Sequence, residues 1–277
     1  MSNDARITIL VDNHAGEGLA AEHAFSLLIE AAGRRILFDT GQGPALAANV
    51  RALQADLRDC HALVISHGHY DHTGGLPFAL GVATGARVYG HPGLVITRYA
   101  VTGGSARAVH IPADALAALH DLPAGRLHWV TRPLPLTEGI ALTGPIPRET
   151  DYEDTGGPFF LDPEGARPDP IDDDLALWMR TSRGLVVCLG CCHAGLVNTL
   201  DLVRRQAGHG PIQMVLGGFH LVNAERRRLD ETVAALRALD VQHIVPCHCT
   251  GDVAVAALRD ALGERVVPGE SGAFYRC

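Results

Sequence analysis

The stretch SHGHYDHTGG, residues 66–75, carries three histidines and one aspartate and ends in a pair of glycines. It directly follows ALVIS, residues 62–66, an apolar run that is typical of a buried β-strand. The glycine pair and the polar side chains indicate a loop. We therefore expect a loop rich in metal-ligating side chains at the C-terminal end of a buried strand.

The spacing of these side chains suits metal binding. Alternate residues of an extended segment point the same way, so His67 and His69 can converge on one ion. Asp71 and His72 are then left for a second ion. A polar turn whose histidines face solvent is the alternative, but it suits one or two histidines rather than this density beside a strand end. The stretch therefore predicts a metal site.

Three later histidines are candidate partners, because zinc takes about four ligands and a catalytic site leaves one position open to water. His193 in LGCCHAG, His220 in LGGFHL and His248 in PCHCTG each follow an apolar run, where a strand would give way to a loop. Taken singly, each would be interpreted as a hydrogen-bonded histidine of the core or the surface. Three repeats of the same placement instead favour one shared edge of the sheets and a common site.

The cysteines allow a rival interpretation. There are seven, an odd number, and four of them lie close to histidines in CLGCCHAG and PCHCTG, which argues against a secreted disulfide framework. A structural thiolate zinc site would draw on Cys188, Cys191, Cys192, Cys247 and Cys249. Cys188, however, falls inside an expected buried strand, where free cysteine is common. Cys191 is close enough to His193 to ligate a metal ion or to lie just behind its ligands.

The first half of the chain is rich in expected strands. RITILVD (residues 6–12) is one, and AFSLLIEAAGRRILFDTG (residues 24–41) predicts a hairpin around a glycine-containing turn. PALAANVRALQ (residues 44–54) predicts a helix that begins at a proline. After the histidine loop, a short helix is expected at residues 76–80 and a strand at ARVYG (residues 86–90), whereas the sequence up to about residue 125 shows little pattern.

The second half alternates strands and helices, which is typical of an α/β fold. The expected strands are LALWM, GLVVCLG, IQMVLGG, HIVP and RVV, and the expected helices are VNTLDLVRRQ, AERRRLDETVAALRAL and DVAVAALRDAL. Residues 145–174 hold proline, glycine and acidic residues and show neither the apolar period of a helix nor that of a strand. They predict a long, ordered, lid-like loop. Without an internal repeat or a low-complexity tract, residues 1–277 are expected to form a single domain.

The composition excludes several classes of protein. Of the 277 residues 47% are hydrophobic, which is typical of a globular protein with a sizeable core. Lysine and arginine total 23 against 31 acidic residues, with no basic stripe of the kind that binds nucleic acid. No apolar stretch reaches the roughly 20 residues of a membrane helix, and the N-terminus turns polar too soon for a signal peptide. We expect a cytoplasmic protein that acts on a small molecule, without nucleic-acid or membrane partners; a homo-oligomer is left open.

The strand-end HxHxDH motif, the later single histidines and ILFDTG (residues 36–41) resemble the metallo-β-lactamase superfamily. Within it, EHAFSLLIE, SHGHYDHTGGL, GCCHAGLVN, GGFHL and PCHCTG resemble the branch of dihydropterin-ribofuranosylaminobenzene phosphate synthases, of the methanopterin pathway. The resemblance spans nearly the whole chain. It implies an α/β fold, an αββα sandwich of two mixed β-sheets flanked by helices, with the metal site at one edge.

The resemblance also implies a ligand set. By the superfamily's pattern, His67 and His69 would bind the first metal, and Asp71 and His72 the second. His248 would be the last histidine ligand. Asp39, in FDTG, would lie behind the ligands or at a strand end.

Two departures from the superfamily's pattern concern the middle of the chain. Most members have a histidine before the penultimate pair of strands and a metal-bridging aspartate after it. Here TGPIPRETDYED lacks the histidine and LGCCHAG lacks the aspartate, so His193 or Cys191 is the expected substitute. A single firmly held ion with a weaker second site is therefore an alternative to a tightly bridged pair.

Hydrolysis is the expected reaction, because a divalent ion that lowers the pKa of bound water makes hydroxide available at neutral pH. We expect a metal-dependent hydrolase in which a metal-bound hydroxide attacks a small ester, lactone or phosphoester, with one or two zinc ions, or iron or manganese, as cofactor. Asp71 is the candidate to orient the hydroxide or shuttle protons, and His220 to donate to the oxyanion or leaving group. Two alternatives are the synthase, a transferase that displaces diphosphate, and a di-iron redox or metal-sensing module.

Candidate substrate-binding residues come from two segments. The lid-like loop offers Arg148, Phe159 and Phe160, which suit a planar or anionic group, although ordinary loop packing also accounts for them. Glu22 and His23 belong to EHAFS, which resembles an N-terminal signature of the branch. We expect one of these two to border the substrate side of the cleft without binding metal; the alternative is a hydrogen-bonded histidine at a strand end.

Overall fold

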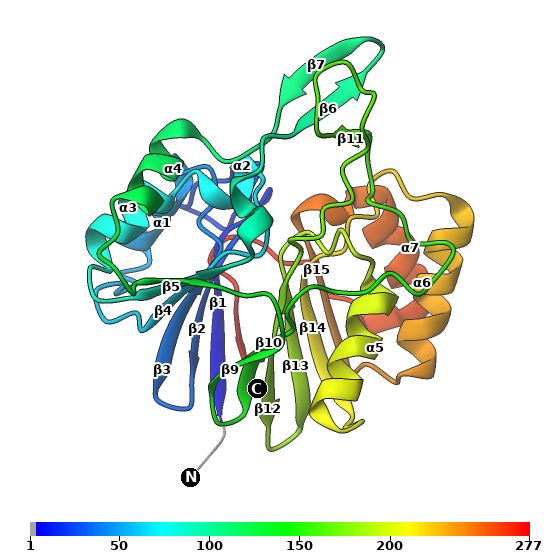
Figure 1. The fold of residues 1–277 in the computed structure, drawn as a ribbon. Helices are drawn as coiled ribbons and strands as arrows, with labels where there is room; N and C mark the ends of the chain where they lie inside the picture. Colours follow the sequence, from blue (N-terminus) through cyan, green and yellow to red (C-terminus); the bar gives the residue numbers. More distant parts are fainter. Residues whose placement is uncertain (1–3) are drawn as a thin grey trace.

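Two mixed β-sheets pack face to face in the computed structural model, which describes residues 4–277. Helices cover the outer face of each sheet, so that four layers follow one another in the order α, β, β, α (Figure 1). The expected αββα sandwich is confirmed.

The first sheet has the strand order β16-β1-β2-β3-β4-β5-β8. Its strands are β1 (Ala5–Val11), β2 (Ser26–Ala31), β3 (Arg34–Phe38), β4 (Ala62–Val64), β5 (Arg87–Gly90), β8 (Leu127–Trp129) and β16 (Phe274–Arg276). β2 is antiparallel to both β1 and β3, and β4 is parallel to β3. The C-terminal ends of β1, β3 and β4 therefore lie at the same edge of this sheet. The outer helices are α1 (Pro44–Ala52), α3 (Leu76–Val82) and α4 (Ala113–His120).

The second sheet has the order β15-β14-β13-β12-β10-β9. Its strands are β9 (Leu134–Thr137), β10 (Ile140–Leu142), β12 (Ala176–Thr181), β13 (Gly184–Leu189), β14 (Ile212–Gly218) and β15 (His243–Cys247). β13, β14 and β15 are parallel to one another, so their C-terminal ends also share one edge. The helices α5 (Leu196–Ala207), α6 (Arg226–Ala238) and α7 (Asp252–Leu262) cover the outer face.

The main core lies between the two sheets. Side chains from both inner faces form one buried cluster, for example Ile7 and Phe38 of the first sheet with Leu177 and Val186 of the second. Burial of each such side chain contributes roughly 1.5–3 kcal/mol. This core fixes the two sheets against one another and thereby fixes the strand ends that meet at their common edge.

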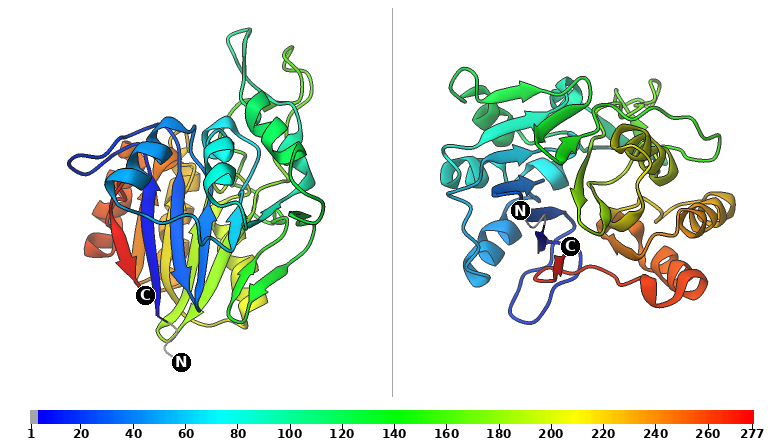
Figure 2. Two further views of the ribbon diagram at one scale, coloured as in Figure 1. Left: turned by 90° about the vertical axis from the view of Figure 1, so that its left-hand side faces the viewer. Right: turned by 90° about the horizontal axis from the view of Figure 1, so that it is seen from below.

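A small third sheet projects above that edge (Figures 1 and 2). It consists of the hairpin β6 (Tyr99–Thr102) and β7 (Ser105–Ala108) with the two-residue strand β11 (Phe159–Phe160). β11 belongs to the lid-like loop of residues 145–174, which thus docks on a hairpin from the first half of the chain.

Two expectations about single elements differ from the structure. RVV is not a strand: it overlaps the short 3₁₀ helix η3 (Gly263–Arg265), and only Val266 forms a bridge, to Ile244. The last strand is instead β16, which pairs with β1. Residues 91–125, where the sequence shows little pattern, hold β6, β7 and α4. β7 could not be predicted because all four of its residues are exposed, so it shows no alternation of apolar and polar residues. Within residues 4–277, no helix combines the length and the apolar character that crossing a membrane requires.

Candidate metal centre

The C-terminal ends of six strands meet at the upper edge of the sandwich in Figure 1. The first sheet supplies β1, β3 and β4, and the second supplies β13, β14 and β15. Residues that follow these ends surround a cavity of about 500 Å³. The topology therefore brings together histidines that lie far apart in the sequence.

Backbone contacts hold the histidine loop in place. The Ser66 N–H donates to Asp39 Oδ1 and its hydroxyl donates to Asp39 Oδ2, both over 2.7 Å. The Gly68 N–H donates to Asp173 Oδ2 over 2.8 Å, and a Cβ at Gly68 would collide with the Leu94 carbonyl. The loop then continues into the short helix α2 (Tyr70–Thr73). These contacts fix the direction in which its side chains point.

Three histidines form the first cluster. His67 Nε2 lies 2.9 Å from His69 Nδ1, and His193 Nε2 lies 3.2 Å from each of these two atoms. All three side chains are buried, and burial lowers the pKa of each well below 6.5. The imidazoles are therefore neutral, which is the form that binds metal.

The outer hydrogen bonds of two of these rings fix their tautomers. His193 Nδ1 lies 2.8 Å from the Thr155 carbonyl oxygen, which can only accept, so this nitrogen carries the proton. His67 Nδ1 lies 2.9 Å from the Ser66 hydroxyl oxygen, whose proton goes to Asp39, so this nitrogen also donates. The Nε2 lone pairs of His67 and His193 are left facing one another, as the lone pairs of two ligands of one ion would.

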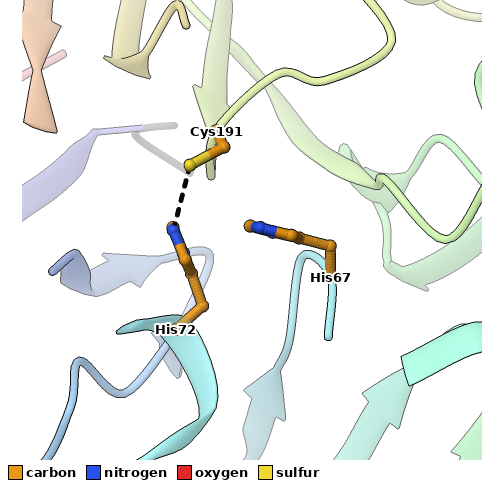
Figure 3. A group of neighbouring side chains, drawn as sticks. All are labelled: His67, His72 and Cys191. Atoms are coloured by element: carbon orange, nitrogen blue, oxygen red, sulfur yellow. Dashed lines mark hydrogen bonds between the residues drawn. The ribbon is translucent and has the colours of Figure 1, made fainter. Parts of the chain in front are cut away.

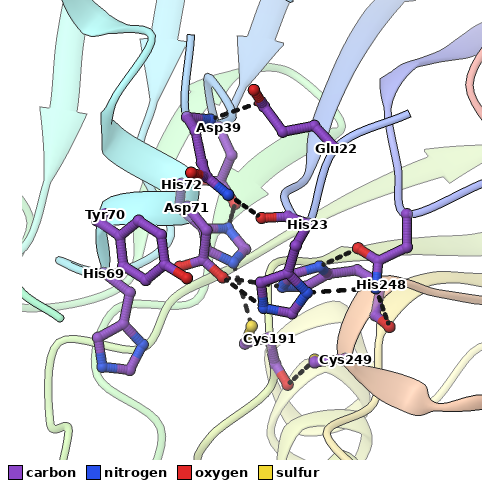
Figure 4. Close-up of polar contacts among 12 residues, drawn as sticks. Glu22, His23, Asp39, His69, Tyr70, Asp71, His72, Cys191, His248 and Cys249 are labelled. Carbon is purple, nitrogen blue, oxygen red and sulfur yellow. Dashed lines mark hydrogen bonds and ion pairs between the residues drawn. The ribbon is translucent and has the colours of Figure 1, made fainter. Parts of the chain in front are cut away.

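A second cluster lies beside the first. Asp71 Oδ2 is 3.3 Å from His248 Nε2 and 3.5 Å from His23 Nε2 (Figure 4). Burial disfavours a charge on His248, but the contact with the Asp71 carboxylate outweighs this and raises the pKa of His248 to about 9. Burial would likewise favour a neutral Asp71, yet the contacts with His248 and His72 keep the pKa of its carboxyl group far below the usual range. The carboxylate thus attracts a positive charge at this point.

His72 and Cys191 join the two clusters. His72 Nδ1 donates to Asp39 Oδ2 over 2.7 Å, and its Nε2 lies 3.1 Å from Cys191 Sγ (Figure 3). The Cys191 sulfur is within 4.8 Å of ligand atoms of His67 and His72, of His193 and His220, and of His248 and Cys249. Burial raises the pKa of this thiol well above 9, so a bound cation would be needed to hold it as a thiolate at neutral pH.

Several buried nitrogen atoms of this region have no hydrogen-bond partner. In the part of the chain that the structure describes, they include His69 Nε2, His220 Nδ1 and His248 Nε2. A buried polar atom without a partner is costly, and a metal site is one of the few settings that explains it. The donor set of neutral imidazole, carboxylate and thiol suits a divalent transition metal.

Comparisons with known proteins identify the family. Residues 20–203 match the family model of the metallo-beta-lactamase superfamily. The chain belongs to this superfamily. Among solved structures, Tm1679, described as a metal-dependent hydrolase of the beta-lactamase superfamily, has a TM-score of 0.80 and 30% identity and covers 98% of each chain. Zn(2+)-bound PqqB from Methylobacterium extorquens shares the fold, with a TM-score of 0.56, 15% identity and coverage of 98% of this chain and 99% of its own.

Two curated relatives come from Methanocaldococcus jannaschii. The uncharacterized protein MJ0448 is 32% identical, over 91% of this chain and 93% of its own. The 7,8-dihydropterin-6-methyl-4-(beta-D-ribofuranosyl)-aminobenzene-5'-phosphate synthase is 28% identical, over 90% of this chain and 88% of its own. The expected resemblance to the superfamily and to this branch is thereby confirmed.

Among metallo-β-lactamase proteins the bridging position after the penultimate strands normally holds an aspartate. Here that place follows β13, where Gly190 leads into Cys191. A Cβ at Gly190 would collide with the Ser66 side chain, so the chain passes close to the histidine loop. Both expected substitutes lie at the site: His193 completes the first cluster, and the Cys191 sulfur lies between the two clusters.

His220 occupies a strained backbone position after β14, with φ of 47°. Its ring lies 4.3 Å from that of His193, measured between centroids, and it lines the cavity. A Cβ at Gly156 would collide with His220 Cδ2, so the lid-like loop needs glycine there. The candidate general acid is thus held between the first histidine cluster and the lid-like loop.

The structure separates the expected substrate-binding residues into two groups. His23 and Phe159 line the cavity, and the Phe159 ring packs on the rings of His69 and His193. The other three do not line the cavity. The Glu22 carboxylate accepts from the Gln42 N–H, and Arg148 donates to the carbonyl oxygens of His193 and Pro170. Phe160 pairs with Tyr99 in the third sheet.

Sequence reasoning missed three residues at the site: Asp12, Asn13 and Arg107. Asp12 and Asn13 follow β1, and the signal that found the histidines, a polar side chain after an apolar run, applies to them as well. Asn13 Oδ1 accepts from His248 Nδ1 over 2.9 Å, and Asp12 Oδ1 accepts from the His248 N–H over 2.8 Å. Arg107 lines the cavity, as does Cys249, which the sequence suggested only for a structural thiolate site. Arg107 lies on the exposed strand β7, and no feature of the sequence marks it.

Proposed function

We propose that the chain is a metal-dependent hydrolase that acts on a small ester, lactone or phosphoester. The observation that carries the proposal is the convergence of seven histidines, one carboxylate and two buried thiols beside one cavity. Membership of a superfamily of metal-dependent hydrolases supports it. A bound divalent ion would lower the pKa of a water molecule from about 16 toward 7 and so supply the nucleophile.

The side chains divide into two ligand sets. His67, His69 and His193 would hold the first ion. Asp71, His72, His248 and Cys191 would hold the second. Zinc and iron suit this mixture of imidazole, carboxylate and thiolate better than magnesium does.

Two residues would handle protons. Asp71 lies on the cavity wall, and its pKa, lowered by His248 and His72, keeps the carboxylate ready to orient the attacking water. His220 also lines the cavity, on the other side of His193, and would donate a proton to the leaving group. Phe159 covers the rings of the first cluster and limits the access of bulk water.

The cavity also points to an acidic substrate. The chain contains no lysine, and Arg107 is the one arginine among the residues that line the cavity in the described part of the chain. Its NH1 donates to the Tyr70 hydroxyl over 3.1 Å, and its guanidinium lies 5.4 Å from the centre of the Tyr70 ring. We therefore favour substrates that carry a phosphate or carboxylate group beside the bond that is cleaved.

The test begins with the metal content of the purified protein and its turnover of a chromogenic acetate ester, a lactone and a phosphodiester. Asp71→Asn should lower turnover by about 100-fold or more, the contribution typical of a positioned proton-transfer group. Asp121→Asn, an exposed carboxylate with 81% of its side chain accessible, is the matched control and should change nothing. Undiminished turnover by Asp71→Asn with full metal content would exclude the role given to Asp71.

A synthase activity is the second candidate, because one relative that spans nearly the whole chain is a named synthase at 28% identity. In that reaction the site would stabilise departing diphosphate instead of generating hydroxide. Incubation with a dihydropterin diphosphate and an aminobenzene riboside phosphate, followed by an assay for released diphosphate, distinguishes the two. Release that depends on both substrates supports the synthase, whereas release without the second substrate is hydrolysis.

A further inference from the structure

Two of the seven cysteines differ from the rest in their surroundings. Cys191 and Cys249 line the cavity. The other five pack into the hydrophobic clusters of the two-sheet core or of the outer helices: Cys60, Cys188, Cys192, Cys247 and Cys277. The ligand set proposed above uses Cys191 and leaves Cys249 without a role.

Cys249 faces the second ligand set. Its sulfur, the Cys191 sulfur and a ring nitrogen of His248 all lie within 4.8 Å of one another, and all three residues are buried. The Cys249 thiol donates to the Cys191 carbonyl oxygen over 3.6 Å (Figure 4). His248 Nε2, on the neighbouring residue, is buried, lies 3.3 Å from Asp71 Oδ2 and forms no well-aligned hydrogen bond. A nitrogen beside one carboxylate and two sulfur atoms is a donor set that a transition-metal cation would complete.

The turn that carries Cys249 is held firmly. It is the 3₁₀ helix η2 (His248–Thr250), which follows β15 directly. The Thr250 hydroxyl donates to the Cys247 carbonyl over 2.7 Å and accepts from the Phe219 N–H over 3.0 Å. A Cβ at Gly218 would lie 2.6 Å from both the Cys249 sulfur and the Gly190 carbonyl oxygen, closer than real contacts allow. Glycine at the end of β14 therefore allows the close approach of both the Gly190 backbone and this thiol.

On the basis of the proposed metal function, we propose that Cys249 is a thiolate ligand of the second ion, together with Cys191 and His248. The second position then has two sulfur donors, which favour zinc, iron or cobalt over magnesium or manganese. Each thiol loses its proton when the ion binds. The two sulfur donors thus make the second position selective for these metals, whereas the histidine loop supplies only imidazole and carboxylate donors.

Cobalt(II) provides a test that does not depend on turnover. The metal-free full-length protein is titrated with cobalt under anaerobic, reducing conditions, and the sulfur-to-cobalt charge-transfer absorption is measured at saturation. Cys249→Ala and Cys191→Ala should each lose about half of the wild-type absorption, and the double variant should lose all of it. Cys188→Ala, a buried core cysteine that does not line the cavity, is the matched control and should keep the full absorption. Full absorption in Cys249→Ala overturns the proposal.

X-ray absorption of the zinc-loaded wild-type protein is a second test, which needs no variant to fold. Zinc–sulfur bonds of about 2.3 Å are distinguished from zinc–nitrogen bonds of 2.0–2.1 Å. With two zinc ions bound, an average of one sulfur donor per zinc supports the proposal, and an average of one half overturns it. Failure of the wild-type protein to bind any metal would instead overturn the proposed function, so the two failures are distinguishable.

Discussion

His193 Nε2 lies 3.2 Å from His67 Nε2, although 126 residues separate the two histidines in the sequence. Both rings carry their proton on Nδ1, so two lone pairs face one another at this distance. Burial lowers the pKa of both histidines well below 6.5, which disfavours a shared proton. A divalent cation bound by both nitrogens would remove the repulsion.

This relationship predicts that His193 is a metal ligand. His193→Ala should reduce the metal affinity of the first position by more than the roughly 10–100-fold loss that is typical of a residue behind the ligands. The measurement is the number of metal ions retained after dialysis against a weak chelator. His120→Ala, an exposed histidine with 88% of its side chain accessible, should retain the wild-type number. An unchanged metal content in His193→Ala would return this histidine to an ordinary hydrogen-bonding role.

Asp39 is predicted to act on the metal through two neighbours. One carboxylate oxygen accepts from both the Ser66 hydroxyl and His72 Nδ1, each over 2.7 Å, so it fixes the His72 ring with Nε2 toward the site. Asp39→Asn replaces an acceptor by an amide and should lower metal affinity at the second position by about 10–100-fold. Thermal melting of the metal-free variant provides the control. If the loss of fold stability accounts for the whole loss of metal affinity, Asp39 has no specific effect on His72.

Much of the fold could be predicted because its strands are either buried runs or follow clear turns. β13, β14 and β15 are almost fully buried, and their apolar runs stand out in the sequence. β7 could not be found this way, since its four residues are exposed. β16 is a three-residue edge strand whose pairing with β1 depends on the whole chain being folded.

Some residues of the site could likewise be predicted from the sequence, and others could not. The histidines could be predicted because each follows an apolar run and the edge of a parallel sheet brings such positions together. Arg148 could not be judged from sequence: its guanidinium is taken up by two backbone carbonyl groups, whose positions depend on the path of the lid-like loop. Arg107 reaches the cavity only through the projecting hairpin, which has no periodic pattern.

Gly156 is predicted to matter through His220. Its φ of 82° is a glycine conformation, and a Cβ would collide with His220 Cδ2. Gly156→Ala should therefore displace the His220 ring and lower kcat while the metal content stays constant. Gly208→Ala is the matched control, because Gly208 has a similar φ of 79° and open space around the added Cβ. Equal kcat in the two variants would show that His220 is not needed for turnover.

Arg107 is predicted to recognise an acidic group of the substrate. A hydrogen bond to a charged group contributes roughly 1.5–3 kcal/mol, and the exposed position of Arg107 reduces this, so Arg107→Ala should raise KM for an acidic substrate by about tenfold. KM for a neutral ester should not change. Arg226→Ala, which removes an exposed arginine paired with Asp230 on α6, is the control. An equal rise in KM for acidic and neutral substrates would argue for a loss of shape rather than of charge recognition.

His23 is predicted to bind substrate and not metal. Its side chain is 58% exposed and lines the cavity, with Nε2 3.5 Å from Asp71 Oδ2 and its ring centre 4.8 Å from that of His248. Partial burial and the neighbouring charge of His248 lower the pKa of His23 below 6.5, so the ring is neutral at neutral pH and can donate or accept a hydrogen bond. Such proximity to Asp71 and His248 would also allow metal binding, and His23→Ala distinguishes the two roles. We expect His23→Ala to keep its full metal content. Its substrate binding should weaken by roughly 1–3 kcal/mol if a buried hydrogen-bond partner is left unpaired. Loss of an ion in this variant would instead make His23 a ligand of the second metal position.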